Sequence, residues 1–349
     1  MEDKLNVTLS VATGANASDT LGAIAQVYRM TDRQMAVAAL SAGALLAAIG
    51  DLLRGLQLRP TGAVVTELCR YPIKSLSRET LKSVVVAKQC AFPGDREWAI
   101  LRGEHLHEHD PTCSRWLHKA KFHVAMLDEQ LSALRIAYSA DTQRLEARDQ
   151  TDKTVLDTVL GTDDGRQKAE SFFAEFLGTE RLNCSADGVP LRLVRSDVPG
   201  HCFHNHNGQV GDQVVHIVNL ETVRALQAKM EPGSALSPYR FRANIYIDGL
   251  AAWEELGWVG RKIQIGDVEM EVECPTIRCP ATQVCPETGK RDMASIFPSF
   301  PQTAFPSLQV HRPDYCRPGA YVGIYAKITN GGELKPGLPV HSQRPVPIE

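Results

Sequence analysis

The sequence lacks three features that mark common classes of protein: a C-x-x-C pair, a marked excess of charge, and an apolar run long enough to cross a bilayer. Without a C-x-x-C pair, the usual pattern of a structural zinc site is missing. The 38 Lys and Arg residues against 41 Asp and Glu residues leave a net charge of −3, so the overall charge does not favour nucleic acid as a partner. Any site for an anion must therefore be local.

The cysteines do not form the pattern of a disulfide scaffold. There are nine of them in 349 residues, an odd number with scattered spacing. Small secreted domains carry an even and closely spaced set instead. We therefore expect free thiols in a reducing compartment, and an intracellular, cytoplasmic protein.

Residues 1–59 are interpreted as an N-terminal extension. They lack the basic start of a secretory signal. Their uncharged run, Met35–Gly50, has 16 residues, whereas a spanning helix needs about 20. Two interpretations stay open: an Ala-rich helix that packs on the main domain or lies outside it, or a membrane anchor through residues 35–53. A boundary is expected near Arg59–Gly62, where strand-like sequence begins.

From residue 60 onward, short runs rich in β-branched residues predict a mainly β fold of the α+β class. The predicted strands are 63–69, 81–87, 98–101, 122–127, 134–138, 144–147, 191–195, 214–218, 244–248, 262–265, 268–273 and 321–328. Helices are predicted at Gly165–Gly178 and Leu220–Met230 from apolar residues at helical spacing. A Pro-rich loop is expected from about Phe297 to Pro318.

The segment Glu273–Gly289 is the densest candidate for chemistry. It places Cys274, Cys279 and Cys285 after a predicted strand, with Arg278 directly before Cys279. A neighbouring cation favours the thiolate, which is the form that ligates metals. The alternative is that these cysteines are small buried apolar residues. Their spacing has no second half that would complete a zinc site.

Three further segments carry groups that suit an anion. Lys74 and Ser75 end the first predicted strand, and Arg96 lies in the segment Gly94–Trp98. Arg240, Arg242 and Asn244 alternate at the entrance to a strand and are expected to face one side of it. Each segment alone also has a purely structural interpretation: a strand exit for the first, an ion pair for the second and a solvated strand face for the third.

Two histidine-rich segments are weaker candidates. His105, His107 and His109 alternate, and on a strand they would share a face that could hold a metal. The segment is also charged and turn-like, which favours a solvent-exposed role. His201, His204 and His206 fit a flexible loop that covers a site.

Five segments, in order along residues 60–342, together resemble the MOSC family, named for the C-terminal domain of molybdenum cofactor sulfurase. They are YPIKS, GDREW, SPYRFRANIYIDGLAAWEELGWVGRKIQIGDVEMEV, IRCPATQVCPETGKRD and VGIYAKITNGGELKPG. Within this family, the segments most resemble those of stand-alone proteins related to the mitochondrial amidoxime-reducing component. The resemblance implies an N-terminal MOSC β-barrel domain at 60–190, a MOSC domain at 191–342 and a tail at 343–349, with a few flanking helices.

The resemblance also implies a cofactor, molybdenum-molybdopterin (Moco), and roles for single residues. Cys279 matches the metal ligand and catalytic centre. The remaining matches are to groups that contact the phosphate and the pterin: Lys74, Ser75, Arg96, Arg242, Asn244 and Arg278. Such an anionic cofactor needs cations and amide donors around one soft thiolate. Pyridoxal phosphate binding is a secondary implication.

The sequence departs from the family pattern at several positions near the expected ligand. Cys285 replaces an Asp, and Pro280 directly follows Cys279. Cys274 lies five residues before Cys279, where close relatives often lack a cysteine. The Pro-rich loop is also longer than in the stand-alone proteins. These departures concern the range of substrates more than the binding of the cofactor.

The implied function is an oxidoreductase that reduces small N-hydroxylated substrates. The sequence shows no flavin, haem or nicotinamide motif, so electrons would come from an external donor of the cytochrome b5/reductase or ferredoxin type. One alternative is a carrier of sulfur or of the cofactor that uses Cys279 without turnover of its own. Another is a scaffold of the same fold that has lost the metal.

Overall fold

The computed structural model describes residues 59–112, 117–197, 202–203, 213–230, 235–293, 296 and 320–343. The chain divides into two compact units, Met1–Gln57 and Leu58–Glu349, and every described residue belongs to the second. The predicted helix or anchor at 35–53, the Pro-rich loop from Phe297 to Pro318, and His201, His204 and His206 lie outside the described residues. In the part of the chain that is described, no helix has both the length and the apolarity to cross a membrane.

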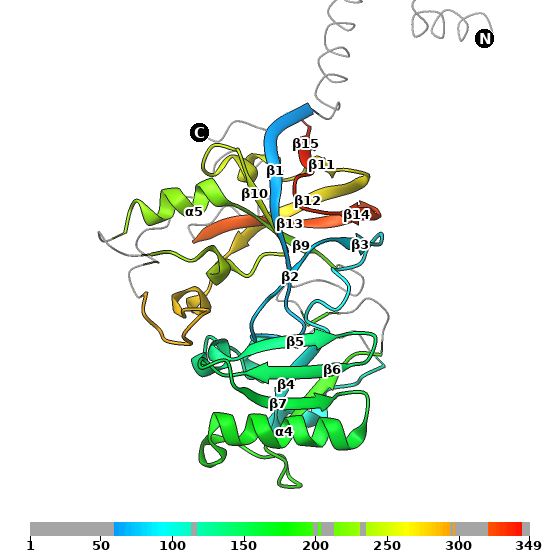
Figure 1. The fold of residues 1–349 in the computed structure, drawn as a ribbon, viewed down its shortest axis with the longest axis vertical. Helices are drawn as coiled ribbons and strands as arrows, with labels where there is room; N and C mark the ends of the chain where they lie inside the picture. The colour runs from blue at the N-terminus through cyan, green and yellow to red at the C-terminus, as the bar shows by residue number, and fades with distance from the viewer. Residues whose placement is uncertain are drawn as a thin grey trace, which may run out of the picture. The chain divides into compact units, whose positions relative to one another are not determined.

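A closed, seven-stranded β-barrel forms the centre of the second unit (Figure 1). Its strands follow the order β10-β9-β13-β12-β11-β15-β1, and β1 pairs back onto β10. The bounds are Arg59–Arg70 (β1), Val215–Asn219 (β9), Ile245–Asp248 (β10), Lys262–Ile265 (β11), Val268–Ile277 (β12), Tyr321–Asn330 (β13) and Pro339–Ser342 (β15). The prediction of a mainly β, α+β fold is confirmed.

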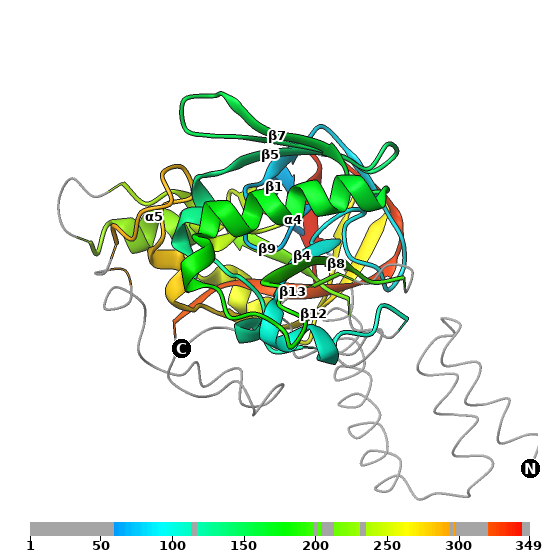
Figure 2. The ribbon, with the colours of Figure 1, turned by 90° about the horizontal axis from the view of Figure 1, so that it is seen from below.

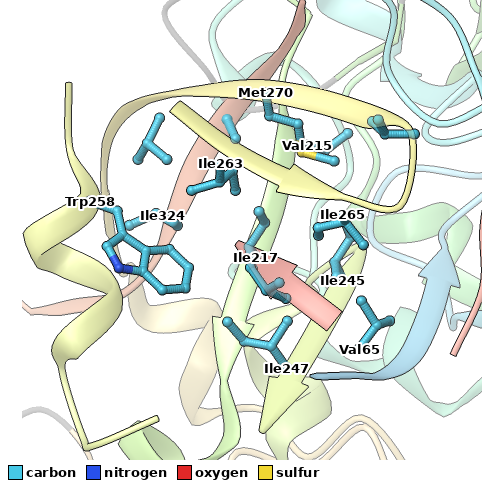
Figure 3. Packing of buried hydrophobic residues seen from close by; sticks show 14 of the residues in the cluster. Val65, Val215, Ile217, Ile245, Ile247, Trp258, Ile263, Ile265, Met270 and Ile324 are labelled. Atoms are coloured by element: carbon cyan, nitrogen blue, oxygen red, sulfur yellow. The ribbon is translucent and has the colours of Figure 1, made fainter. Parts of the chain in front are cut away.

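Alternating side chains explain why the strands close around one core. In β12, Val268, Met270 and Val272 are buried, whereas Glu271 between them is exposed. Figure 3 shows apolar side chains from the barrel strands converging with Trp258. The strands β9 and β10 are parallel, and α5 (Leu220–Gln227) connects them. The apolar contacts that stabilise the barrel therefore join segments that lie far apart in the sequence.

A second layer with its own apolar core packs beside the barrel. The ladder β5 (Arg135–Ser139), β6 (Arg144–Arg148) and β7 (Thr154–Val159) packs with α4 (Asp163–Leu177). The pair β4 (Trp98–Arg102) and β8 (Leu191–Arg195) completes this layer. Figures 1 and 2 show α4 on the outside of the layer, away from the barrel.

The remaining elements are short. Small strands lie at Glu79–Leu81 (β2), Val84–Val86 (β3) and Gly332–Leu334 (β14). The 3₁₀ helices are Gly103–Glu108 (η1), Lys119–Lys121 (η2), Glu129–Ala133 (η3), Thr179–Arg181 (η4), Pro238–Phe241 (η5), Glu254–Trp258 (η6) and Pro280–Gln283 (η7). The strands β7, β14 and β15 are not among those that the sequence patterns predicted.

Two strand predictions are wrong in their detail. The predicted strand 81–87 is split into the end of β2 and the separate strand β3, because β2 pairs with β1 whereas β3 pairs with β14. The predicted strand 122–127 is a turn after a single bridge from Phe122 to Leu101. The amides of Leu127 and Asp128 both donate to the Val124 carbonyl, which closes that turn.

The strand β1 bears on the predicted division of the chain. It lies within the segment 60–190, yet it pairs with β10 and β15 from the segment 191–342. The barrel therefore includes a strand from the predicted N-terminal domain. A division into domains at 60–190 and 191–342 stays a prediction.

Candidate functional site

Six of the seven predicted site residues line one pocket, which we call the Cys279 pocket. Its empty space is about 690 Å³, including a part open to solvent. The lining residues are Lys74, Ser75, Arg96, Lys119, Val124, Ala125, Met126, Phe203, His216, Arg240, Phe241, Arg242, Arg278, Cys279, Ala281 and Tyr325.

Strand pairing brings these distant residues together. Lys74 and Ser75 follow the end of β1, and Arg242 precedes β10, which pairs with β1. Arg278 and Cys279 follow the end of β12. The side chains that line the pocket therefore come from loops at strand ends, a common place for binding groups on a rigid scaffold.

The backbone at the pocket is strained at three positions. Ser75, Arg96 and Arg242 have φ angles of 74°, 47° and 52°. They are three of the seven non-glycine residues with positive φ in the described part of the chain. Residues other than glycine rarely adopt this conformation, and it persists only where the surrounding structure holds it. Its concentration here is typical of a functional site.

The charges in the pocket are all of one sign. Six cations line it and no carboxylate does, among the described residues. Burial and the neighbouring Arg96 and Arg242 guanidinium groups lower the pKa of Lys74 to about 7. Burial and Arg96 likewise lower the pKa of Arg242 to about 10. An anionic ligand would relieve this repulsion, so the pocket is suited to an anion.

Tyr71 lies against the guanidinium groups of both Arg96 and Arg242. The guanidinium carbon of Arg96 is 4.4 Å from the centre of the Tyr71 ring, and that of Arg242 is 4.2 Å from it. Arg96 also donates to the Arg242 carbonyl at 2.9 Å and pairs with the buried Asp95. These contacts hold both guanidinium groups in place.

Arg278 has a donor that no described residue accepts from. Its Nη2 donates to the Phe241 carbonyl at 2.8 Å, and its Nη1 lies 3.5 Å from Nε2 of His216. Its Nε is buried and has no hydrogen-bond partner among the described residues. An unpaired buried donor is costly, and an anionic acceptor would satisfy it.

Cys279 is half-buried and directly precedes η7. Its carbonyl accepts hydrogen bonds from the amide and the hydroxyl of Thr282, each at 3.0 Å. Within the described ranges, no group of three or more His, Cys, Asp or Glu side chains could hold a metal ion. A metal at Cys279 would therefore depend on ligands that a cofactor brings.

Asn244 is the one predicted site residue that does not line the pocket. It is fully buried, and its side chain joins β9 to β1: Oδ1 accepts from the His216 amide at 3.1 Å, and Nδ2 donates to the Cys69 carbonyl at 3.3 Å. The expected common face of Arg240, Arg242 and Asn244 is wrong, because β10 begins only at Ile245.

The structure adds His216 and Tyr325 to the pocket lining, and Arg240, already a candidate from the sequence, lines it as well. Burial and Arg278 lower the pKa of His216 well below its usual value, so its imidazole is neutral. A single histidine or tyrosine within a strand gives no signal in the sequence. His105 and His107 lie in the 3₁₀ helix η1 and His109 directly follows it, so these histidines do not share a strand face. His105 pairs with Glu108.

Comparison with known proteins agrees with this architecture. Residues 199–341 match the family model of the MOSC domain. Mitochondrial amidoxime reducing component 2 of Bos taurus is 28% identical over 303 residues, which cover 79% of this chain and 82% of that protein. Molybdenum cofactor sulfurase of Drosophila ananassae is 26% identical over 288 residues, which cover 80% of this chain and 34% of that protein.

The chain thus spans about a third of the length of that sulfurase. Among solved structures, the YUAD protein of Bacillus subtilis aligns with a TM-score of 0.35 and 11% identity, covering 82% of this chain and 98% of that one.

Proposed function

We propose that this chain, which carries a MOSC domain at residues 199–341, binds the molybdenum cofactor in the Cys279 pocket. The observation that carries the proposal is the pocket itself: six cations and no carboxylate, among the described residues, around a half-buried thiol. Anionic phosphate and a soft metal are the chemistry that cations and a thiolate select.

The residues present fit such a group. Lys74 and Arg96 offer buried charge to a phosphate, Arg242 offers a half-buried one, and Ser75 adds a hydroxyl. Arg278 offers the unused Nε donor described above. Cys279 is the proposed metal ligand. When bound, the cofactor would supply a metal that changes oxidation state; the protein holds it, orients it and shields it from water.

The proposed reaction is the reduction of small N-hydroxylated substrates, with electrons from an external donor of the cytochrome b5/reductase or ferredoxin type. The support is the name of the bovine relative, which aligns over most of its length. The sulfurase relatives favour a second candidate, a carrier that holds sulfur or the cofactor at Cys279 without turnover. Pyridoxal phosphate binding stays a prediction, and an absorption spectrum of the purified chain would test it.

The first test is the molybdenum and pterin content per chain. We expect both in the wild type, and we expect Cys279→Ala to lose most of the molybdenum because the one protein ligand is gone. Cys184→Ala is the matched control, since Cys184 is exposed and does not line the pocket. Equal, near-zero molybdenum in wild type and Cys279→Ala would contradict the proposal.

A second test separates the two candidate activities. The loaded protein is given a hydroxylated amidine and a reconstituted electron donor. Turnover that Cys279→Ala abolishes supports the reductase. Loaded protein without turnover, which passes its molybdenum to an acceptor protein, supports the carrier.

A further inference from the structure

Two walls of the Cys279 pocket come from separate parts of the chain. One is the turn 124–129, which contributes Met126, and the other is residues 279–292, here called the Cys279 loop, which contributes Ala281. Met126, Cys279 and Ala281 are half-buried, whereas Lys74 and Arg96 on the same lining are buried. The half-buried part of the pocket lining therefore includes residues from both walls.

One side chain, Arg291, joins these walls. Its Nη2 donates to the Met126 carbonyl at 2.8 Å, and its Nε pairs with Glu129 at 3.0 Å, both on the turn. Its Nη1 donates within the Cys279 loop, to the Pro280 carbonyl at 3.2 Å and to Oε1 of Gln283 at 3.1 Å. The planar guanidinium thus bridges the two walls with four hydrogen bonds.

The turn on one side of this bridge is held firmly by its own contacts. Asp128 accepts from Arg102 at 2.7 Å and lies 3.0 Å from Nδ1 of His123. The turn closes on the Val124 carbonyl, as described above. Arg291 therefore docks on a wall that does not need it for its shape.

The Cys279 loop is also well formed, and it abuts the neighbouring η3 closely. The amide of Cys285 donates to the Lys290 carbonyl at 2.8 Å, and Arg240 pairs with Asp292 at 2.7 Å. Gly289 has a φ of +66°, and a Cβ atom there would lie 2.9 Å from the Cβ of Ala133. Each wall is held within itself, and Arg291 contributes most of the polar contact between them near Cys279.

We propose that Arg291 is a positioning residue that fixes the separation of the two walls and so limits the size of molecules that reach the Cys279 thiol. The consequence for the reaction rests on the proposed function: if the pocket turns over substrates, the fixed separation of the walls selects slender ones. The limit on size is a property of the protein chain alone, so it can be measured by thiol chemistry.

The experiment measures the rates at which Cys279 is alkylated by small iodoacetamide and by a maleimide that carries a bulky polymer. The full chain is produced without molybdenum, and each cysteine is followed by mass spectrometry. We compare wild type, Arg291→Ala and Arg291→Lys. The control is Arg144→Ala on β6, which removes an arginine that donates two hydrogen bonds to Asp157, at 2.8 and 2.6 Å, and does not line the pocket.

We expect Arg291→Ala to reduce the preference for the small reagent at Cys279 by about fivefold, the scale of losing one or two net hydrogen bonds. Arg291→Lys keeps the charge without the planar bridge, so its size preference should lie between those of the wild type and Arg291→Ala. Arg144→Ala should match the wild type, and labelling of exposed Cys184 should not change in any variant.

An unchanged size preference in Arg291→Ala overturns the proposal. A parallel rise in the labelling of the buried Cys69 and Cys274, with a lowered melting temperature, also overturns it, because that result means general loosening. The molybdenum content of the wild type is measured separately. Its absence contradicts the proposed function and leaves the labelling result standing.

Discussion

At the scale of single residues, Tyr71 and Glu255 show two ways of accommodating charge in a protein interior. Tyr71 offers its ring to two guanidinium groups, so Arg96 and Arg242 can lie close together despite their like charges. Glu255 is fully buried, and no ion pair joins it to a cation among the described residues. It accepts hydrogen bonds from Nδ2 of Asn219 at 3.1 Å and from the Thr222 hydroxyl at 2.9 Å. Neutral donors compensate only part of the cost of burying a carboxylate.

Glu255 should make the stability of the protein depend on pH. Burial raises the pKa of its carboxyl from 4.5 to about 7. The folded state then binds the proton more tightly than the unfolded state, so the free energy of unfolding falls as the pH rises from about 4.5 to about 7. The loss is complete above about pH 7 and amounts to at most about 3 kcal/mol.

Urea unfolding at about pH 5 and about pH 8 tests this dependence. When the pH is raised between these two values, the free energy of unfolding of Glu255→Gln should fall less than that of the wild type, because glutamine does not titrate. Glu333→Gln is the control, since Glu333 is exposed on β14. If the wild type and Glu255→Gln lose stability equally over this range, Glu255 is not the cause.

At the scale of elements, local patterns explain α4 well. Thr162 caps its start with a hydroxyl that accepts from the Gly165 amide at 3.1 Å, and Gly178 ends it with a φ of 88°. Glu170 then joins the helix to β8, through Arg192 at 2.6 Å and the Leu193 amide at 2.9 Å. The helix lies within two residues of its prediction at each end, since its signals are adjacent in the chain.

The cap of α4 yields a prediction for this element. Thr162→Ala should lower the free energy of unfolding by about 1 kcal/mol, because the first turn loses an acceptor. Thr162→Ser keeps the hydroxyl and should stay within a few tenths of a kcal/mol of the wild type. Chemical denaturation of the three proteins measures the difference. Equal losses in both variants would mean that the threonine methyl group matters rather than the cap.

At the scale of the whole molecule, barrel closure by β1 creates the pocket. Lys74 and Ser75 follow the end of β1. The pairing of β1 with β10 brings them beside the loops before β10 and after β12. Without that pairing, the cations would lie in separate parts of the chain. Residues 1–58 precede this strand, and their role stays a prediction because they lie outside the described residues.

We expect the full-length chain in the soluble fraction of lysed cells, since the run Met35–Gly50 is shorter than the roughly 20 residues of a spanning helix. The comparison is a chain that begins at Arg59, assayed in the same cells. Recovery of the full-length chain, but not of the shorter one, with the membranes would contradict this expectation and establish an anchor through residues 35–53.

The sequence by itself determined the elements whose signals are local. The strands β11 and β12 were predicted from runs rich in β-branched residues and α4 from apolar residues at helical spacing. Lys74, Arg96 and Cys279 were predicted from short motifs and a family resemblance. Only the tertiary structure decided which of these side chains meet. It placed Asn244 between two strands, brought His216 to the pocket, and set Arg291 between two of the pocket's walls. The reason is physical: periodicity and capping depend on neighbours in the chain, whereas strand pairing depends on apolar burial between segments far apart in sequence.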